Sequence, residues 1–143
     1  DGNDSAENLA DKKVNVLVAE DNALNMEIAE FMLSEKGAAV TKAINGKEAV
    51  DIWKNSKEGT FELILLDLMM PVMTGIDAAK AIRNSERSDA KTVPIAAMTA
   101  NNLYEDITEC EKVGMNGLLA KPLKADCLTE LINNLEKTKF YTK

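Results

Sequence analysis

Hydrophobic and polar positions along the chain follow two alternating patterns, short apolar runs and longer stretches with helical spacing. Short apolar runs bounded by polar residues predict β-strands, above all where Val, Ile and Leu dominate. Each run here is followed by a helical stretch. We therefore expect five strands, at Val14–Ala19, Ala38–Ala43, Phe61–Leu66, Val93–Met98 and Gly117–Ala120.

Apolar residues spaced three and four positions apart predict a helix after each strand. The apolar face of the first helix consists of Leu24, Ile28, Phe31 and Met32. The faces of the later helices consist of Ala49, Ile52 and Trp53, of Ile76, Ala79 and Ile82, of Leu103, Ile107 and Cys110, and of Leu128, Leu131, Ile132 and Leu135. Strict alternation with short connections predicts a single α/β domain whose parallel sheet is covered by helices on both faces.

Length and composition agree with one folded domain. The chain has 143 residues, of which 45% are hydrophobic and 29% charged, and both fractions are ordinary for a soluble globular domain. We assign residues 14–138 to the domain. Residues 1–13 are polar and aperiodic, so we interpret them as a linker or expression remnant, and residues 139–143 as a C-terminal tail.

Charge and rare residues exclude several classes of function. A net charge of -7 and a pI near 4.7 argue against binding to nucleic acid or to anionic membranes and favour proteins or cations as partners. The chain contains no histidine, which excludes catalytic triads that use one. Cys110 and Cys127 have no metal-binding spacing, and we expect both to be reduced, buried hydrophobic residues.

Chemically useful residues follow four of the five predicted strands. Glu20 and Asp21 follow the first strand, Asp67 the third, Thr99 the fourth and Lys121 the fifth. The carboxyl ends of parallel strands meet at one edge of a sheet, where ligands bind. Two unit charges 4 Å apart repel by about 4 kcal/mol at an effective dielectric constant of 20. Such a cluster therefore requires positive charge, which Lys121 and a divalent cation with oxygen ligands, such as Mg²⁺, would supply.

The same residues suggest a reaction. A carboxylate such as Asp67 can attack a phosphoryl group and form an acyl phosphate. The cation and Lys121 would neutralise the phosphoryl oxygens, and the Thr99 hydroxyl would donate a hydrogen bond to one of them. The sequence thus predicts a phosphoryl-transfer site that needs no histidine in this chain.

Four motifs in this order resemble the receiver domains of two-component response regulators, the CheY-like family. They are the acidic pair "ED", the segment "LLDLMMPVMTG", the triplet "MTA" and the dipeptide "KP". The resemblance extends from about Val14 to Leu135. It implies a doubly wound, flavodoxin-like sheet with strand order 2-1-3-4-5.

The resemblance also implies a role for each site residue. Asp67 would accept a phosphoryl group from a phosphohistidine of a histidine kinase or histidine phosphotransfer domain. Glu20, Asp21, Asp67 and the backbone carbonyl of Met69 would bind Mg²⁺, or Mn²⁺ in its place. Thr99 and Lys121 would contact the phosphoryl group, and the peptide bond between Lys121 and Pro122 would be cis. The domain would be a signalling module without enzymatic activity beyond its own phosphoryl transfer and slow dephosphorylation.

The sequence departs from the usual receiver pattern at three positions. Leu118 stands where many receivers carry an aromatic switch residue, which implies that this chain switches through other contacts. Met69 and Asn101 occupy positions that tune hydrolysis of the acyl phosphate in this family. An apolar Met69 would hinder the attacking water, so we expect a long-lived phosphorylated form.

The stretches "VAEDNALN" and "MTAN", after a polar leader, are similar to receivers fused to hybrid sensor kinases, and we favour that origin over a stand-alone regulator. The domain would then lie in the cytoplasm, whether or not the parent chain is anchored in a membrane. The oligomeric state, the stimulus and the cognate kinase stay open.

Three other functions are alternatives to this interpretation. A haloacid-dehalogenase-like phosphatase needs a second aspartate two residues after the nucleophile, where this chain has Met69. A flavodoxin-like cofactor binder needs a phosphate-binding first loop, which "EDNALN" does not provide. A pseudo-receiver that binds partners without phosphorylation would not need the complete site. Taken singly, Glu20 and Asp21 are better explained as an acidic turn that caps the first helix, Thr99 as a helix cap or satisfied hydroxyl, and Lys121 as a surface charge.

Overall fold

Strands and helices alternate along the chain as the sequence predicts. The computed structural model describes residues 14–100, 103–135 and 140–142. Its elements are β1 (Val14–Ala19), α2 (Ala23–Glu35), β2 (Ala38–Ala43), α3 (Gly46–Asn55), β3 (Leu63–Asp67), α4 (Gly75–Arg83), β4 (Ile95–Thr99), α5 (Leu103–Lys112), β5 (Gly117–Ala120), α6 (Ala125–Asn133) and β6 (Tyr141–Thr142).

The strands form one parallel sheet in the order β2-β1-β3-β4-β5-β6. The predicted order 2-1-3-4-5 is confirmed, but the predicted count of five strands is one short. The sixth strand lies within the segment that the sequence analysis assigned to the C-terminal tail. Its two residues are too few to show a periodic pattern, and they pair with the edge of β5 that would otherwise be open. The hydroxyl of Tyr141 also donates to Oε1 of Glu130 on α6 over 2.9 Å.

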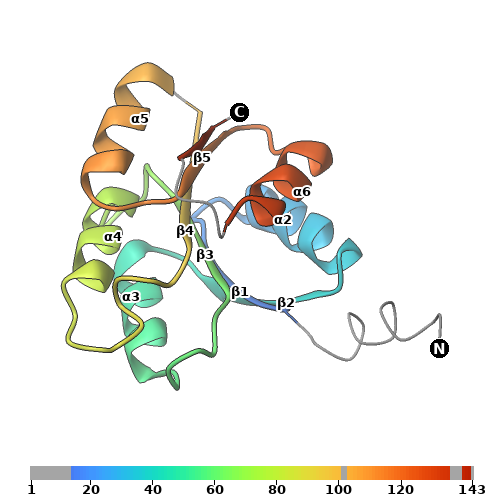
Figure 1. Ribbon diagram of the computed structural model, residues 1–143. Helices are drawn as coiled ribbons and strands as arrows, with labels where there is room; N and C mark the ends of the chain where they lie inside the picture. The colour runs from blue at the N-terminus through green and yellow to red at the C-terminus, as the bar shows by residue number, and fades with distance from the viewer. Residues whose placement is uncertain (1–13, 101–102, 136–139, 143) are drawn as a thin grey trace.

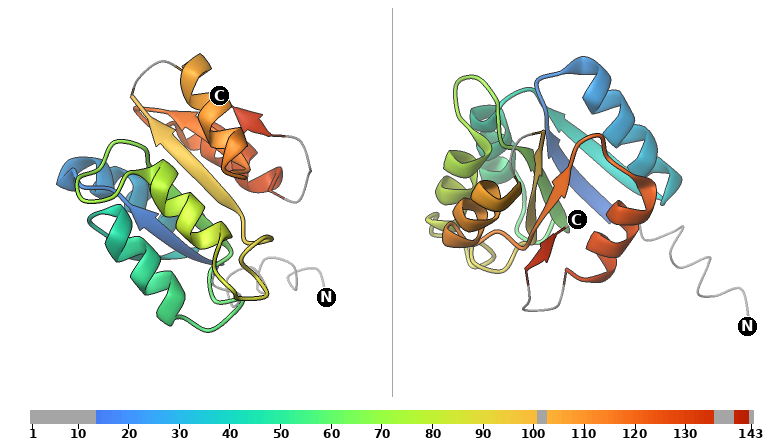
Figure 2. Two further views of the ribbon diagram at one scale, coloured as in Figure 1. Left: turned by 90° about the vertical axis from the view of Figure 1, so that its left-hand side faces the viewer. Right: turned by 90° about the horizontal axis from the view of Figure 1, so that it is seen from above.

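Helices cover both faces of the sheet, as Figures 1 and 2 show. Helices α3, α4 and α5 cover one face, and α2 and α6 cover the other. Successive residues of β1 face opposite layers, with Leu17 in the core under α3–α5 and Val18 in the core under α2 and α6. This double coverage explains why the central strands are continuous apolar runs rather than alternating ones.

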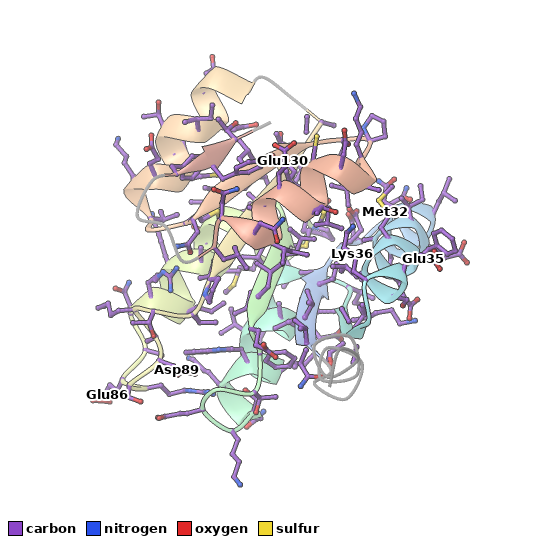
Figure 3. The ribbon with its side chains drawn as sticks, turned by 45° about the vertical axis from the view of Figure 1, so that its right-hand side comes forward. Met32, Glu35, Lys36, Glu86, Asp89 and Glu130 are labelled. Atoms are coloured by element: carbon purple, nitrogen blue, oxygen red, sulfur yellow. The ribbon has the colours of Figure 1, made fainter. Side chains whose placement is uncertain are left out.

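Helices α2 and α6 lie on the same side of the sheet (Figure 3). Lys36, at the end of α2, donates a hydrogen bond from its ammonium to Thr129 of α6. Asn22 caps the start of α2, since its side chain accepts from the amide of Asn25 over 2.9 Å. This cap begins α2 immediately after the acidic pair that follows β1.

The predicted apolar face of the first helix is wrong at two of its four positions, while Ile28 is half-buried and Met32 packs against the core. Leu24 and Phe31 are 65% and 66% exposed, whereas Met26, Ala29 and Leu33 are buried against the sheet. Both sets of residues are apolar and both follow helical spacing, so periodicity alone cannot decide between them. The small Ala29 on the buried face lets the helix approach the sheet closely, and the larger side chains are left in solvent.

Two strands end one residue later than predicted. Asp67 is the last residue of β3, and Thr99 is the last residue of β4. Both side chains are therefore held by the backbone of the sheet itself and not by a loop, which gives the edge where they lie a fixed geometry.

Candidate functional site

Four parallel strands end at the same edge of the sheet, and each supplies one predicted site residue there. Asp67 and Thr99 end β3 and β4, while Glu20 follows β1 and Lys121 follows β5. The register of β1 and β3 places Glu20 and Asp67 each one residue beyond the last aligned pair. The fold thus brings together acidic and basic side chains that are 47 and 54 residues apart along the chain.

The ammonium of Lys121 lies between two carboxylates. Its Nζ is 2.8 Å from Oε1 of Glu20 and 3.1 Å from Oδ2 of Asp67. The second oxygen of each carboxylate accepts a backbone hydrogen bond. Oε2 of Glu20 accepts from the amide of Asn22 over 3.1 Å, and Oδ1 of Asp67 accepts from the amide of Met69 over 3.2 Å. Both carboxylates are therefore fixed in orientation.

Burial and charge act together at this cluster. Glu20 is 2% exposed and Asp67 is 4% exposed. Burial raises the pKa of Glu20 above its ordinary value, and the charge of Asp67 adds to this rise while Lys121 opposes it. Burial alone would lower the pKa of Lys121, but its two carboxylate partners raise it above its ordinary value. Burial is thus the main cause of the raised pKa of Glu20, whereas the raised pKa of Lys121 arises because one ammonium faces two buried carboxylates.

Three carboxylates could hold a cation here. Glu20, Asp21 and Asp67 each offer an oxygen, and these oxygens lie within 4.8 Å of one another. Three carboxylates against the single ammonium of Lys121 leave two negative charges, the charge that one divalent cation would balance. Oε1 of Glu20 is buried and, apart from its ion pair with Lys121, makes no aligned hydrogen bond to the described residues. A set of oxygen donors with free lone pairs fits a hard cation such as Mg²⁺.

The loop after Asp67 packs tightly against the end of β3. A side chain at Gly75 would place its Cβ 2.5 Å from the backbone oxygen of Asp67, so only glycine allows this approach. The amide of Gly75 donates to the carbonyl of Leu68 over 3.1 Å. Val72 has a φ angle of 70°, a left-handed conformation that is rare for a β-branched residue. Close contacts between the backbone of Gly75 and that of Asp67 and Leu68 therefore fix the position of Asp67.

Thr99 makes a contact that the sequence analysis missed. Its side chain is 1% exposed, and its hydroxyl donates to Oδ2 of Asp106 over 2.5 Å. Asp106 lies in the first turns of α5, beside Glu105. Acidic residues are common in the first turn of a helix because they favour its positive end. For that reason Asp106 carried no distinctive signal in the sequence.

The remaining predicted residues are placed as follows. The peptide bond between Lys121 and Pro122 is cis, as predicted. Leu118 is completely buried in the core under α3–α5, and the side chain of Met69 is 65% exposed. Asn101 lies outside the described residues, so its expected role stays a prediction.

Two further expectations concern the cysteines and membranes. Cys110 is buried and Cys127 is half-buried, and both are free thiols. Burial and the nearby carboxylates of Asp106 and Glu109 raise the pKa of Cys110 to about 12, so this thiol is unreactive near neutrality. None of the helices in the described ranges has the length and hydrophobicity needed to cross a membrane.

Comparison with known proteins identifies the family. Residues 16–133 match the response regulator receiver domain. The chain is 35% identical over 120 residues to hybrid signal transduction histidine kinase I of Dictyostelium discoideum, an alignment that covers 82% of this chain and 7% of that kinase.

Two solved structures have the same fold. The receiver domain of the sensor histidine kinase PA1611 from Pseudomonas aeruginosa, which holds magnesium in its active-site cleft, is 35% identical with a TM-score of 0.76, covering 86% of this chain and 97% of that domain. The receiver domain of Ssk1 from Saccharomyces cerevisiae, crystallised with the phosphotransfer protein Ypd1, is 38% identical with a TM-score of 0.74, covering 86% and 88%. The chain belongs to the response regulator receiver domain family, whose members act in two-component and phosphorelay signalling.

Proposed function

We propose that Asp67 is the phosphoacceptor of this receiver domain and takes its phosphoryl group from a phosphohistidine of a partner protein. One observation supports this most directly: Asp67 is buried at the sheet edge, with Lys121 3.1 Å away and the carboxylates of Glu20 and Asp21 beside it. Such a site concentrates positive charge, from lysine and cation, on the oxygens of an incoming phosphoryl group.

The reaction follows from this geometry. A carboxylate oxygen of Asp67 attacks the phosphorus, a new O–P bond forms, and the P–N bond to the partner histidine breaks. The electron pair of that bond stays on the ring nitrogen, and the ring leaves as neutral imidazole because its other nitrogen carries a proton. The amide of Met69 and the ammonium of Lys121 orient the carboxylate for attack, and Lys121 is also placed to neutralise the phosphoryl oxygens. Positioning and charge compensation supply most of the catalysis in phosphoryl transfer.

Magnesium completes the proposed site. Glu20, Asp21, Asp67 and the backbone carbonyl of Met69 would hold the ion, and Mn²⁺ prefers a similar set of oxygen ligands. When bound, the ion supplies Lewis-acid stabilisation of the phosphoryl oxygens. The magnesium found in the PA1611 receiver supports this proposal for Mg²⁺.

The surface around Asp67 favours a protein partner. Four of the large hydrophobic side chains that are exposed within the described ranges lie in segments that follow or begin at the carboxyl ends of the strands: Leu24 at the start of α2, Ile44 after β2, and Met69 and Val72 after β3. Apolar groups around an acidic centre suit a helical partner that inserts a phosphohistidine between them. The complex of the Ssk1 receiver with Ypd1 supports a histidine phosphotransfer domain or a histidine kinase as that partner.

The cellular context is also a proposal. The similarity to hybrid kinases favours a receiver that forms part of a longer kinase chain. We place the domain in the cytoplasm, where phosphoryl groups derived from ATP and reduced thiols such as Cys110 and Cys127 are both found.

Phosphorylation with a small donor tests the proposed function. The protein is incubated with Mg²⁺ and acetyl phosphate, and intact mass spectrometry should show one added phosphoryl group. Asp67→Asn should abolish this mass increase, because an amide is not a competent nucleophile. Asp51→Asn, on an exposed surface of α3, is the matched control and should be phosphorylated like the wild type. A wild-type protein that gains no phosphoryl group, or an Asp67→Asn variant that does, contradicts the proposal.

Met69 provides a second measurement on the phosphorylated protein. We propose that its apolar side chain, two residues beyond Asp67, slows attack of water on the acyl phosphate. Met69→Asn should then shorten the lifetime of the phosphorylated form, followed by loss of the phosphoryl mass over time. An unchanged lifetime would show that Met69 has no such role.

A further inference from the structure

The bond between Thr99 and Asp106 links the site to a helix. Thr99 ends β4 at the edge that carries Asp67, and its hydroxyl donates to the carboxylate of Asp106 over 2.5 Å. A hydroxyl has one proton to donate. In the structure, that proton is engaged by Asp106 on α5.

We infer that Asp106 is a positioning residue that holds α5 in its resting place through Thr99, and that phosphorylation of Asp67 breaks this bond. The inference rests on the proposed function. A phosphoryl group brings a charge of about -1.5 to -2 and three strong acceptor oxygens to the site. The single proton of Thr99 can serve a phosphoryl oxygen or Asp106, but not both.

Electrostatic repulsion acts in the same direction as this competition. Asp106 and a phosphorylated Asp67 are both negative, and Asp67 and Thr99 end neighbouring strands at the same edge of the sheet. Once Thr99 donates to the phosphoryl group, Asp106 loses its hydrogen bond and meets additional negative charge. Both changes favour displacement of α5, so the local charge change is converted into movement of a helix.

Among the side chains of α5 that the structure describes, residues 105–112, few are buried. Among residues 105–112, Cys110 is the one buried side chain, and Ile107 is partly buried. Helix α4, which lies in the same layer (Figure 1), buries Ala78, Ala79 and Ile82. The bond from Thr99 to Asp106 adds to the contacts that hold α5 against the sheet, so breaking it makes a shift of the helix less costly.

The residue at position 118 strengthens this inference. Leu118 is completely buried beside the core residues under α3–α5. A leucine there offers no aromatic ring or hydroxyl that could follow the movement of Thr99. The hydrogen bond from Thr99 to Asp106 provides a direct route from the site to α5 that does not pass through β5.

Three variants separate the hydrogen bond from the charge. Asp106→Ala removes both, and Asp106→Asn removes the charge but keeps an oxygen that can accept from Thr99. Glu105→Gln removes one negative charge from the same helix turn at an exposed neighbour, so it controls for the effect on the helix dipole. Each protein is compared at rest and with Mg²⁺ and beryllofluoride, a phosphoryl analogue.

Hydrogen exchange of peptides covering residues 105–112 reports the position of α5, and titration reports the affinity for beryllofluoride. In the wild type, α5 should exchange faster once beryllofluoride binds. Asp106→Ala should show fast exchange already at rest and bind beryllofluoride about five- to tenfold more tightly, because no bond to Thr99 must break. Asp106→Asn should be intermediate, and Glu105→Gln should match the wild type.

A second-site variant distinguishes coupling from a general loss of stability. In a Thr99→Ala background, Asp106→Ala should change the beryllofluoride affinity clearly less than in the wild type, because only the charge repulsion is left to relieve. Equal effects in both backgrounds, or no effect of Asp106→Ala in a wild type that is phosphorylated normally, would overturn the inference and leave the proposed function intact. A wild type that accepts no phosphoryl group at Asp67 would instead overturn both.

Discussion

Two clusters of buried charge lie at opposite edges of the sheet, and they are satisfied very differently. At the amino edge, the guanidinium of Arg83 is 9% exposed. It donates to the carbonyls of Gly114 and Ala90 over 3.0 and 2.9 Å and to Oδ1 of Asn116 over 3.0 Å. Burial lowers the pKa of Arg83, but every nitrogen of the guanidinium has a partner.

Arg87 continues this cluster in the loop between α4 and β4. Its guanidinium makes two bonds of 3.0 Å to Asp89, labelled in Figure 3, and lies 4.1 Å from the centre of the Trp53 ring. It also donates to the carbonyl of Ser56 over 2.9 Å. Burial acts against the ionised form of Asp89, yet the bonds from Arg87 and Gly59 lower the pKa of this carboxyl. The guanidinium groups at this edge are thus satisfied by hydrogen bonds, and those of Arg87 join the segment after α3 to the loop before β4.

The carboxyl edge has the opposite character. Glu20 and Asp67 share one ammonium, and Asp21 adds a further negative charge. Among the described residues, Oε1 of Glu20 has no aligned hydrogen bond. A fully satisfied cluster stabilises the fold, whereas a cluster with excess charge and free lone pairs lowers stability until a ligand arrives. Buried charge therefore indicates a functional site where hydrogen bonds or opposite charges are missing, and a structural role where they are complete.

The largest effect is expected at the satisfied edge. Arg83→Met should lower the free energy of unfolding by about 3 kcal/mol, because the carbonyls of Ala90 and Gly114 lose their donor and Oδ1 of Asn116 keeps only the amide of Ile95. Lys80→Met, at an exposed position of the same helix, should change it little. Urea denaturation measures both values. A loss in Arg83→Met no greater than in Lys80→Met would refute this view of the amino edge.

Magnesium should have the next largest effect, and it should act at the other edge. At a concentration one hundred times its dissociation constant, Mg²⁺ should raise the free energy of unfolding by about 2.7 kcal/mol. The gain should disappear in Asp67→Asn and persist in Arg83→Met. Thermal unfolding with and without the ion provides the measurement, and equal stabilisation of Asp67→Asn would place the ion elsewhere.

The pH dependence should sharpen the contrast. Because the pKa of Glu20 is raised, the folded protein without Mg²⁺ holds this proton more tightly than the unfolded chain. The stabilising contribution of the proton is complete below the ordinary value of 4.5 and is lost as pH rises through the raised pKa. Mg²⁺ requires the ionised form, so its binding should weaken as pH falls through the raised pKa, by up to about 1.4 kcal/mol per pH unit.

Calorimetric titration with Mg²⁺ at several pH values tests this expectation. Glu20→Gln supplies the control, since the stability of the metal-free variant should lose this part of its pH dependence. A magnesium affinity that is constant down to the ordinary carboxyl pKa would show that Glu20 does not bind the ion.

The smallest expected effect on stability comes from the repulsion between the carboxylates of Glu20 and Asp67. Asp67→Asn in the absence of Mg²⁺ should raise the free energy of unfolding by about 1 kcal/mol, since Lys121 then pairs with Glu20 alone. Denaturation in the presence of a chelator measures the change. A destabilised Asp67→Asn variant would mean that the carboxyl edge is as well satisfied as the amino edge.

Much of the fold and of the candidate site could be predicted from the sequence. Continuous apolar runs identified the strands because both faces of the sheet are covered. The residues after those runs identified the site because parallel strands deliver their carboxyl ends to one edge. Glu20, Asp67 and Lys121 were predicted in this way, and their mutual distances agree with the prediction.

Other features required the tertiary structure. The two apolar faces of α2 are equivalent in the sequence, and only packing against the sheet decided that Leu24 and Phe31 stay in solvent. The strand β6 is too short to carry a periodic signal. Nothing in the sequence distinguishes Arg83 from a surface charge, since its burial depends on the turn before β5, where it bonds to Gly114 and Asn116.

The sequence by itself determined the alternation of elements, the edge at which charge collects and the family to which the chain belongs, because these depend on local patterns and on the rules of parallel sheets. Only the tertiary structure decided which helix face is buried and which side chain receives the proton of Thr99. Such contacts depend on how whole elements are oriented, and no local pattern specifies the angle at which α5 presents Asp106 to the end of β4.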